Sequence, residues 1–211
     1  SRFALGHMAK PPIPKAVVRW SGEPLDGKKI LIISEQGFGD LFQMLACVQR
    51  LKQRGAKVAL QCHPRLHRLL LASGLISEVC DESGQHPEAD YYEWLMSLPG
   101  KLHLQPGDVP TSSHWIRPPS EGDDSWKEPL LEKPGLKVGL NFQGSPEFPH
   151  DQFRSLDVRH FQPLFEREDL TVVSIQKGFG EDQLDKLPKD SLVAVGHLLD
   201  TGDHAFADTA R

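Results

Sequence analysis

The stretch Glu35-Gln36-Gly37-Phe38-Gly39-Asp40 (EQGFGD) lies between a short apolar run, residues 30–33, and a segment in which apolar residues recur every three or four positions. A run of four aliphatic residues, three of them β-branched, is typical of a strand buried on both faces. The periodic residues that follow predict a helix ending at Gly55. The order strand, glycine turn and helix indicates an α/β fold with a parallel sheet.

The same alternation continues along the chain. Further strands are expected at residues 57–62, 76–82 and 89–99, with a helix at 65–72. After a long segment dense in Pro, Ser, Gly and Asp, the pattern begins again, with strands at 136–142, 170–176 and 191–196 and a helix at 156–167. Strands that alternate with helices predict parallel units with right-handed crossovers.

This pattern predicts four segments in the chain. Residues 1–18 are a tag or lead-in that opens with SRFALGHM, and residues 19–104 form an N-terminal Rossmann-like domain. Residues 105–134 are a linker, and residues 135–211 begin a second Rossmann-like domain with too few elements to complete a doubly wound sheet. We expect the second domain to be partial.

Composition excludes several classes of protein. The 211 residues carry a formal net charge of -5, with a pI near 6.0, and neither nucleic acids nor membrane surfaces are attracted by such a field. The sequence has no apolar run of about 18 residues and no secretory signal pattern. Three cysteines without a CxxC pair argue against a disulfide framework. A cytoplasmic globular protein is expected.

Several spaced motifs together resemble one family. RWSGEPLDGK is followed by EQGFGD, then MSLP, GSPEFPHDQFRS and SIQKG. In this order they resemble the glycosyltransferase-like domain found downstream of tetratricopeptide repeats in bacterial proteins. That domain is similar to the lipopolysaccharide heptosyltransferases and, more distantly, to the O-linked N-acetylglucosamine transferases. The resemblance runs from about Arg19 to the C-terminus.

The resemblance implies a GT-B fold, in which two Rossmann-like domains face each other across a cleft. The first binds mainly the acceptor, and the second binds mainly the nucleotide-sugar donor. Relatives continue past FADTA into a further strand and helix that help to hold the nucleotide, whereas this sequence ends at Arg211. We therefore expect an incomplete donor site, with tetratricopeptide repeats or the missing C-terminal part as neighbours.

Asp40 is the candidate catalytic residue. Inverting glycosyl transfer needs a base to take the proton of the acceptor hydroxyl, and the resemblance implies that the Asp of the Gly-Asp dipeptide supplies it. The alternative is that Asp40 caps the helix, because an acid at a helix start accepts backbone N–H bonds and suits the macrodipole.

Gly37, Phe38 and Gly39 are the candidate acceptor-binding residues. The two glycines permit positive φ and a close approach of backbone to ligand, and the side chain of Phe38 is expected to point toward that ligand. The third glycine of a dinucleotide-binding fingerprint would fall at Phe42, which argues against a nicotinamide or flavin cofactor. No cofactor is expected beyond the nucleotide-sugar, which is a substrate.

On the donor side the candidates are Arg154, Ser155, Gln176 and Lys177. They follow two predicted strands, and ligands of parallel sheets bind at the carboxyl ends of strands. A guanidinium or ammonium group there can stabilise the charge of a leaving diphosphate. The alternative interpretation of Arg154 and Lys177 is that they are solvated surface charges without a role in binding.

A metal site is not expected. His63 and His67 are four residues apart, but Pro64 follows His63 and no spacing matches a zinc module.

The sequence therefore leaves two hypotheses for the function of this protein. The first is an inverting, metal-independent glycosyltransferase that moves a sugar from a nucleotide-sugar to a hydroxyl of a saccharide, lipid-linked or protein acceptor. The second is a non-catalytic interaction module that keeps the same scaffold.

Overall fold

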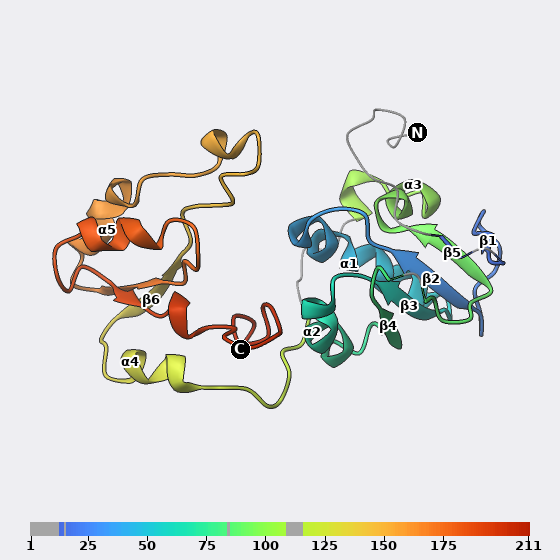
Figure 1. Cartoon of the computed structure of the whole chain (residues 1–211), viewed down its shortest axis with the longest axis horizontal. Helices are drawn as coiled ribbons and strands as arrows, with labels where there is room; N and C mark the ends of the chain where they lie inside the picture. The colour runs from blue at the N-terminus through green and yellow to red at the C-terminus, as the bar shows by residue number, and fades with distance from the viewer. Residues whose placement is uncertain (1–12, 15, 84, 109–115) are drawn as a thin grey trace. The chain divides into compact units, whose positions relative to one another are not determined.

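The computed structural model describes residues 13–14, 16–83, 85–108 and 116–211. The chain divides into two compact units, with the boundary between Ser120 and Glu121, and each unit holds its own parallel sheet (Figure 1). The α/β class with Rossmann-like parallel sheets is confirmed. The segment SRFALGHM lies outside the described residues.

The first unit is built on a five-stranded sheet in the order β1-β5-β2-β3-β4. Every neighbouring pair is parallel, and β2 and β3 run in register from Lys29 opposite Lys57 to Ile33 opposite Gln61. The four strands expected from the sequence are present; the two-residue edge strand β1 was not expected. The strands are β1 (Val18–Arg19), β2 (Lys29–Ile33), β3 (Lys57–Gln61), β4 (Glu78–Cys80) and β5 (Tyr91–Trp94).

The main helix of this unit is α1 (Phe38–Gln53), which buries six residues: Leu41, Leu45, Ala46, Cys47, Val48 and Leu51. Gly55 follows it at a φ of +84°, and an added Cβ would lie 2.8 Å from the Cα of Asp26, so the predicted glycine stop is sterically required. The remaining elements are α2 (His67–Ala72), α3 (Leu98–Lys101) and the 3-10 turns η2 (Pro64–Leu66), η3 (Leu95–Ser97) and η4 (Pro106–Asp108). No helix among the described residues has the length and hydropathy of a membrane span.

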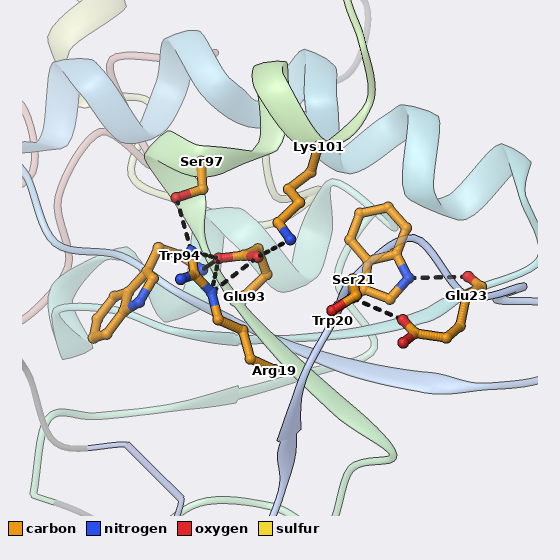
Figure 2. A network of polar contacts seen from close by, with 8 residues as sticks. All are labelled: Arg19, Trp20, Ser21, Glu23, Glu93, Trp94, Ser97 and Lys101. Carbon is orange, nitrogen blue, oxygen red and sulfur yellow. Dashed lines mark hydrogen bonds and ion pairs between the residues drawn. The ribbon is translucent and has the colours of Figure 1, made fainter. Parts of the chain in front are cut away.

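A buried carboxylate joins the edge of this sheet to its neighbours (Figure 2). Glu93 on β5 is fully buried, and Arg19 on β1 donates to its Oε1 from Nε at 3.0 Å and from Nη2 at 2.7 Å. The Nζ of Lys101 on α3 lies 3.7 Å from the Oε2 of Glu93. A buried charge is tolerated only when it is paired in this way, so the network fixes β1 and α3 to β5.

The residues that follow Arg19 form a turn of their own. The Nε1 of Trp20 donates to the Glu23 carbonyl at 2.9 Å, and the Ser21 amide donates to the Glu23 carboxylate at 2.7 Å (Figure 2). Trp20 is fully buried. The RWSGE part of the first motif therefore has a structural explanation.

We predict that Arg19→Ala destabilises the protein by about 2–3 kcal/mol. The substitution leaves the Glu93 carboxylate buried with Lys101 alone, and removing one partner of a fully buried pair costs roughly 3–5 kcal/mol; half of the Arg19 side chain is exposed, which reduces the cost. Urea denaturation measures the loss. The matched control is Lys28→Ala, which breaks the exposed pair with Asp90 and should cost under about 1 kcal/mol. Equal losses in the two variants would contradict the prediction.

The second unit has a three-stranded parallel sheet in the order β6-β7-β8. Side chains alternate across β7, so Val172 packs with Leu140, Phe142 and Val158 on one side, while Val173 packs with Val195 and Leu199 on the other. The helix expected at 156–167 forms as a 3-10 turn followed by one short helix. The elements are β6 (Leu136–Leu140), β7 (Leu170–Ser174), β8 (Val193–Ala194), α4 (Glu128–Leu131), α5 (Gln162–Phe165), η5 (Ser125–Lys127), η6 (Asp151–Phe153), η7 (Val158–Phe161), η8 (Glu181–Lys186) and η9 (Gly196–Leu198).

The range expected to be a linker contains part of this second unit. Residues 109–115 lie outside the described residues, but η5 and α4 form at residues 125–131. Trp126 and Leu130 pack against the cluster of Val173, Val195 and Leu199. Two apolar side chains four residues apart can share one helical face, and here that face joins the core of the second unit.

Gly196 offers a test of how tightly the second unit is packed. An added Cβ would collide with the backbone carbonyl of Gln176, which cannot move aside as a side chain would. We predict that Gly196→Ala lowers the free energy of unfolding by about 1–3 kcal/mol or more, read as a fall in thermal midpoint. Gly139→Ala on β6, where a Cβ meets nothing within 4 Å, is the control and should be close to neutral. A neutral Gly196→Ala would show that the contact is not rigid.

Candidate functional site

Asp40 lies in the first turn of α1, directly after the loop that follows β2. The N-cap residue is Gly37, and no side chain makes a cap hydrogen bond there. Asp40 is half-buried and makes no hydrogen bond or ion pair among the described residues. The hydrogen-bonded cap of the alternative interpretation does not form, and both carboxylate oxygens remain able to accept a proton.

The two glycines of this loop do not use their conformational freedom. Gly37 has a φ of -64°, and neither Gly37 nor Gly39 has a positive φ, although glycine permits one. An added Cβ would lie 3.8 Å from the Asp40 Oδ2 at Gly37 and would meet nothing within 4 Å at Gly39. The two glycines leave the backbone beside Asp40 exposed, because they carry no side chain.

Phe38 and Glu35 connect this loop to its neighbours at the carboxyl edge of the sheet. The ring of Phe38 meets the ring of His63, after β3, edge-on with centroids 5.4 Å apart. The Oε1 of Glu35 accepts a hydrogen bond from the Met96 amide, after β5, at 3.3 Å. Phe38 therefore packs on His63, and neither His63 nor Glu35 had been predicted to support this edge.

In the second unit, the loop after β6, residues 141–155, is built around Asp151, and we call it the Asp151 loop. Asp151 is part of the motif GSPEFPHDQFRS but was not predicted as a site residue. Its side chain accepts hydrogen bonds from Arg154 Nε at 2.9 Å and from Ser155 Oγ at 2.8 Å. The Ser155 Oγ in turn accepts from the Gly144 amide at 2.9 Å. The hydrogen bonds of Ser155 and then Arg154 hold the pKa of Asp151 below its usual value. Asp151 thus holds the side chains of both Arg154 and Ser155, while their role in donor binding stays a prediction.

The position of the Arg154 guanidinium is set by its surroundings. A Cβ on Gly144 would lie 2.6 Å from Arg154 Nη2 and 2.7 Å from Asp151 Oδ1, so only glycine lets the pair lie on the backbone. On the other side, the guanidinium carbon lies 4.5 Å from the centroid of the Phe148 ring. The terminal nitrogens donate no hydrogen bond within the described residues, and 52% of the side chain is exposed. The charge is held in place and open to a ligand.

Gln176 uses its side chain within the protein. Its Oε1 accepts from the amides of Phe142 and Gln143 at 3.0 Å each, and its Nε2 donates to the carbonyls of Gln143 at 2.9 Å and Phe179 at 2.6 Å. These four bonds satisfy the amide fully, and only 3% of the residue is exposed. Gln176 fixes the start of the Asp151 loop instead of offering a polar group to a ligand.

Lys177 is directed to a different segment. Its ammonium donates to the carbonyls of Leu199 and Asp200. Nearby, donor atoms of Asp200, His204 and Asp208 all lie within 4.8 Å of one another, a spacing that suits one cation. The same carboxylates, however, close the segment by reciprocal bonds from the Asp200 and Asp208 amides at 2.8 Å, so a structural role explains their placement.

The histidine pair and the cysteines have structural explanations as well. His63 Nδ1 caps η2 by accepting from the Arg65 amide, and His67 Nε2 lies 3.3 Å from the Cys62 carbonyl. Burial raises the pKa of the Cys62 thiol to about 12 and that of Cys47 and Cys80 to about 11. These thiols are poor nucleophiles near neutral pH.

The fold is similar to that of a solved glycosyl transferase. The chain is similar to the crystal structure of the glycosyl transferase family 9 protein from Veillonella parvula DSM 2008, with a TM-score of 0.53 and 13% identity over 84% of this chain and 71% of that chain. At this identity the similarity establishes the fold, a Rossmann-like GT-B arrangement of elements. No protein-family model matches the sequence.

Among characterised sequences, the chain is similar to Protein FlbA of Caulobacter vibrioides. The two are 24% identical over 205 residues, which cover 87% of this chain and 34% of FlbA. The chain therefore spans about a third of the length of this relative.

The hydrogen bond between Ser155 and Asp151 can be tested by titrating the Asp151 carboxyl. We predict that Ser155→Ala raises the pKa of Asp151 toward its ordinary value, because the largest contribution to the shift is the Ser155 hydrogen bond. A lowered folded pKa stabilises the protein above the unfolded pKa, about 3.9, and this stability is lost as the pH falls through the folded value. In the variant, acid unfolding should therefore begin at a higher pH. Carboxyl ¹³C NMR and acid titrations measure both shifts. The control is Ser191→Ala, whose hydroxyl donates to the Pro188 carbonyl in the surface turn after η8.

Proposed function

We propose that this chain supplies the acceptor side and part of the donor side of an inverting, metal-independent glycosyltransferase. The observation that carries the proposal is the unpartnered Asp40 carboxylate beside exposed glycine backbone, at the carboxyl end of a parallel sheet with a glycosyltransferase-like fold. Ligands of parallel α/β sheets bind at this edge. The resemblance of the EQGFGD motif agrees with the same role.

In the proposed reaction, an acceptor hydroxyl attacks the anomeric carbon of a nucleotide-sugar. The hydroxyl proton passes to Asp40 as the new C–O bond forms, and the bond to the diphosphate breaks with its electron pair on the leaving phosphate oxygen. The guanidinium of Arg154 stabilises that leaving charge as a fixed cation, without a metal ion. Attack opposite the leaving group inverts the anomeric centre.

Local charge matters in this proposal, because the second unit is acidic. Residues 121–209 contain nine Lys or Arg and eighteen Asp or Glu, a net charge of -9. Such a field repels a nucleotide diphosphate at long range. Binding must therefore depend on short-range groups, and Arg154 is a candidate because its guanidinium is held by Asp151 and Phe148 while half of its side chain stays exposed.

The polar contacts of the second unit favour one alternative. Gln176 and Lys177 bond to the protein's own carbonyls and amides, and Ser155 bonds to Asp151 and Gly144. Three of the four donor-side candidates thus stabilise the loop itself. A non-catalytic interaction module that retains the scaffold would use them in the same way.

The test is binding followed by transfer. Calorimetry with uridine, adenosine, guanosine and cytidine sugar nucleotides should show binding by the full chain, and radiolabelled donors with saccharide, lipid-linked and protein acceptors should show transfer. We expect Asp40→Asn to lower the transfer rate by roughly 10²–10⁴ with donor affinity unchanged, because a neutral amide cannot take the proton. Glu82→Gln, which removes an exposed carboxylate of the same unit, should leave the rate unchanged.

Two outcomes would redirect the assignment. Full activity in Asp40→Asn would exclude Asp40 as the base and leave the transferase intact. If the wild-type chain binds no sugar nucleotide, the interaction module becomes the better description, with tetratricopeptide repeats or another part of a longer protein as its partner. In either case we propose that the protein acts in the cytoplasm.

A further inference from the structure

Three aromatic rings form a row on the surface of the loop that carries Arg154. The ring of His150 lies between two phenylalanines, with its centroid 5.8 Å from that of Phe148 and 6.2 Å from that of Phe153. Phe148 is 45% exposed and Phe153 is 80% exposed. We call Phe148, His150 and Phe153 the aromatic row. Exposing so much apolar surface is unfavourable in an isolated domain, so a cluster of this kind marks a contact site.

Successive turns hold the aromatic row in place. The amide of Asp151 donates to the Phe148 carbonyl at 3.0 Å, and that of Phe153 donates to the His150 carbonyl at 3.1 Å. The Asp151 side chain then binds Arg154 and Ser155. The backbone between Phe148 and Arg154 is therefore fixed, although the rings face solvent. A prearranged aromatic surface binds a flat ligand with little loss of conformational entropy.

The cation beside the aromatic row indicates the class of ligand that the row would bind. The Arg154 guanidinium stacks over one end of the row, 4.5 Å from the Phe148 centroid. An aromatic surface adjoining a fixed cation is complementary to a flat, polarisable ring linked to an anionic group. A sugar or a simple phosphate would use only one of these two features. A nucleoside diphosphate uses both.

We propose that the aromatic row is the nucleobase subsite of the donor, with the base stacked on Phe153 and His150 and the diphosphate next to Arg154. This inference rests on the proposed function and adds the part of the substrate that the second unit recognises. The loop follows β6, at the carboxyl edge of its sheet, where such ligands bind. Recognition by stacking tolerates different bases, because every base offers a π face.

The experiment compares ligands with and without a base. Calorimetry of the full chain measures the affinities of uridine and adenosine diphosphates and of inorganic pyrophosphate. Phe153→Ala should weaken both nucleotides roughly 5- to 100-fold, the range expected for loss of one stacked base, and leave pyrophosphate within twofold. Phe153→Trp, which keeps an aromatic ring at this position, should bind both nucleotides with the affinity of the wild type. Saturation-transfer NMR of the wild type should mark the base protons most strongly.

Two control variants separate stacking from other effects. Arg154→Gln should weaken all three ligands, since it removes the charge. Leu136→Ala, which replaces an apolar residue that is also largely exposed, at the opposite end of β6, should change none of them. Folding of each variant is checked by its thermal midpoint, and Phe153 is exposed enough to be replaced safely.

The possible failures are distinct. Nucleotide affinity that is unchanged in Phe153→Ala, or lost equally for pyrophosphate, would overturn the base subsite while leaving the proposed function in place. Saturation transfer to the sugar protons alone would assign the row to the sugar and overturn the base assignment. If the wild type binds neither nucleotide nor pyrophosphate, the proposed function and the base subsite both fail.

Discussion

Parallel pairing of strands is the constraint on which the rest of this structure depends. Because β2 pairs in parallel with β3 and β5, the segments after all three strands emerge at one edge of the first sheet. This places the EQGFGD loop beside His63 and Met96, which are far from it in sequence. In the second unit the same rule brings the Asp151 loop next to Gln176. In an antiparallel sheet, the carboxyl ends of neighbouring strands lie at opposite edges, so these loops would not lie side by side.

Much of the fold could be predicted because its strands are short apolar runs between turn residues. The run at Ile30–Ile33 and the periodic residues of α1 are unambiguous, and Gly55 ends the helix for a steric reason that the sequence also suggests. β1 was missed because its two residues are exposed and lack any period; pairing with β5 and the Arg19–Glu93 contact stabilise it. Such tertiary stabilisation leaves no local signal.

The candidate sites were predictable only in part, since sequence motifs identify residues without their partners. Asp40 was proposed through the resemblance of its Gly-Asp dipeptide, and Arg154 by its position in a loop after a predicted strand. Asp151 was not found, although it organises the loop, because an acid among turn residues is common and its two bonds become visible only when the loop is folded. Gln176 was predicted to bind the donor from its position after a strand; the sequence does not show that its buried amide bonds to backbone groups of the loop after β6.

Asp40 and Asp151 show how surroundings separate two chemically identical side chains. Both lie in the segment that follows a strand of a parallel sheet, Asp40 in the first turn of α1 and Asp151 in η6, and glycines precede both. Asp151 accepts bonds from Ser155 and Arg154, which stabilise its anion and make it a poor proton acceptor, so it is suited to holding a cation in position. Asp40 has no such donors among the described residues and adjoins open backbone, so its lone pairs are available to a substrate. In the proposed reaction, the difference between Asp151, which holds Arg154, and Asp40, the proposed base, therefore follows from hydrogen bonding and not from residue type.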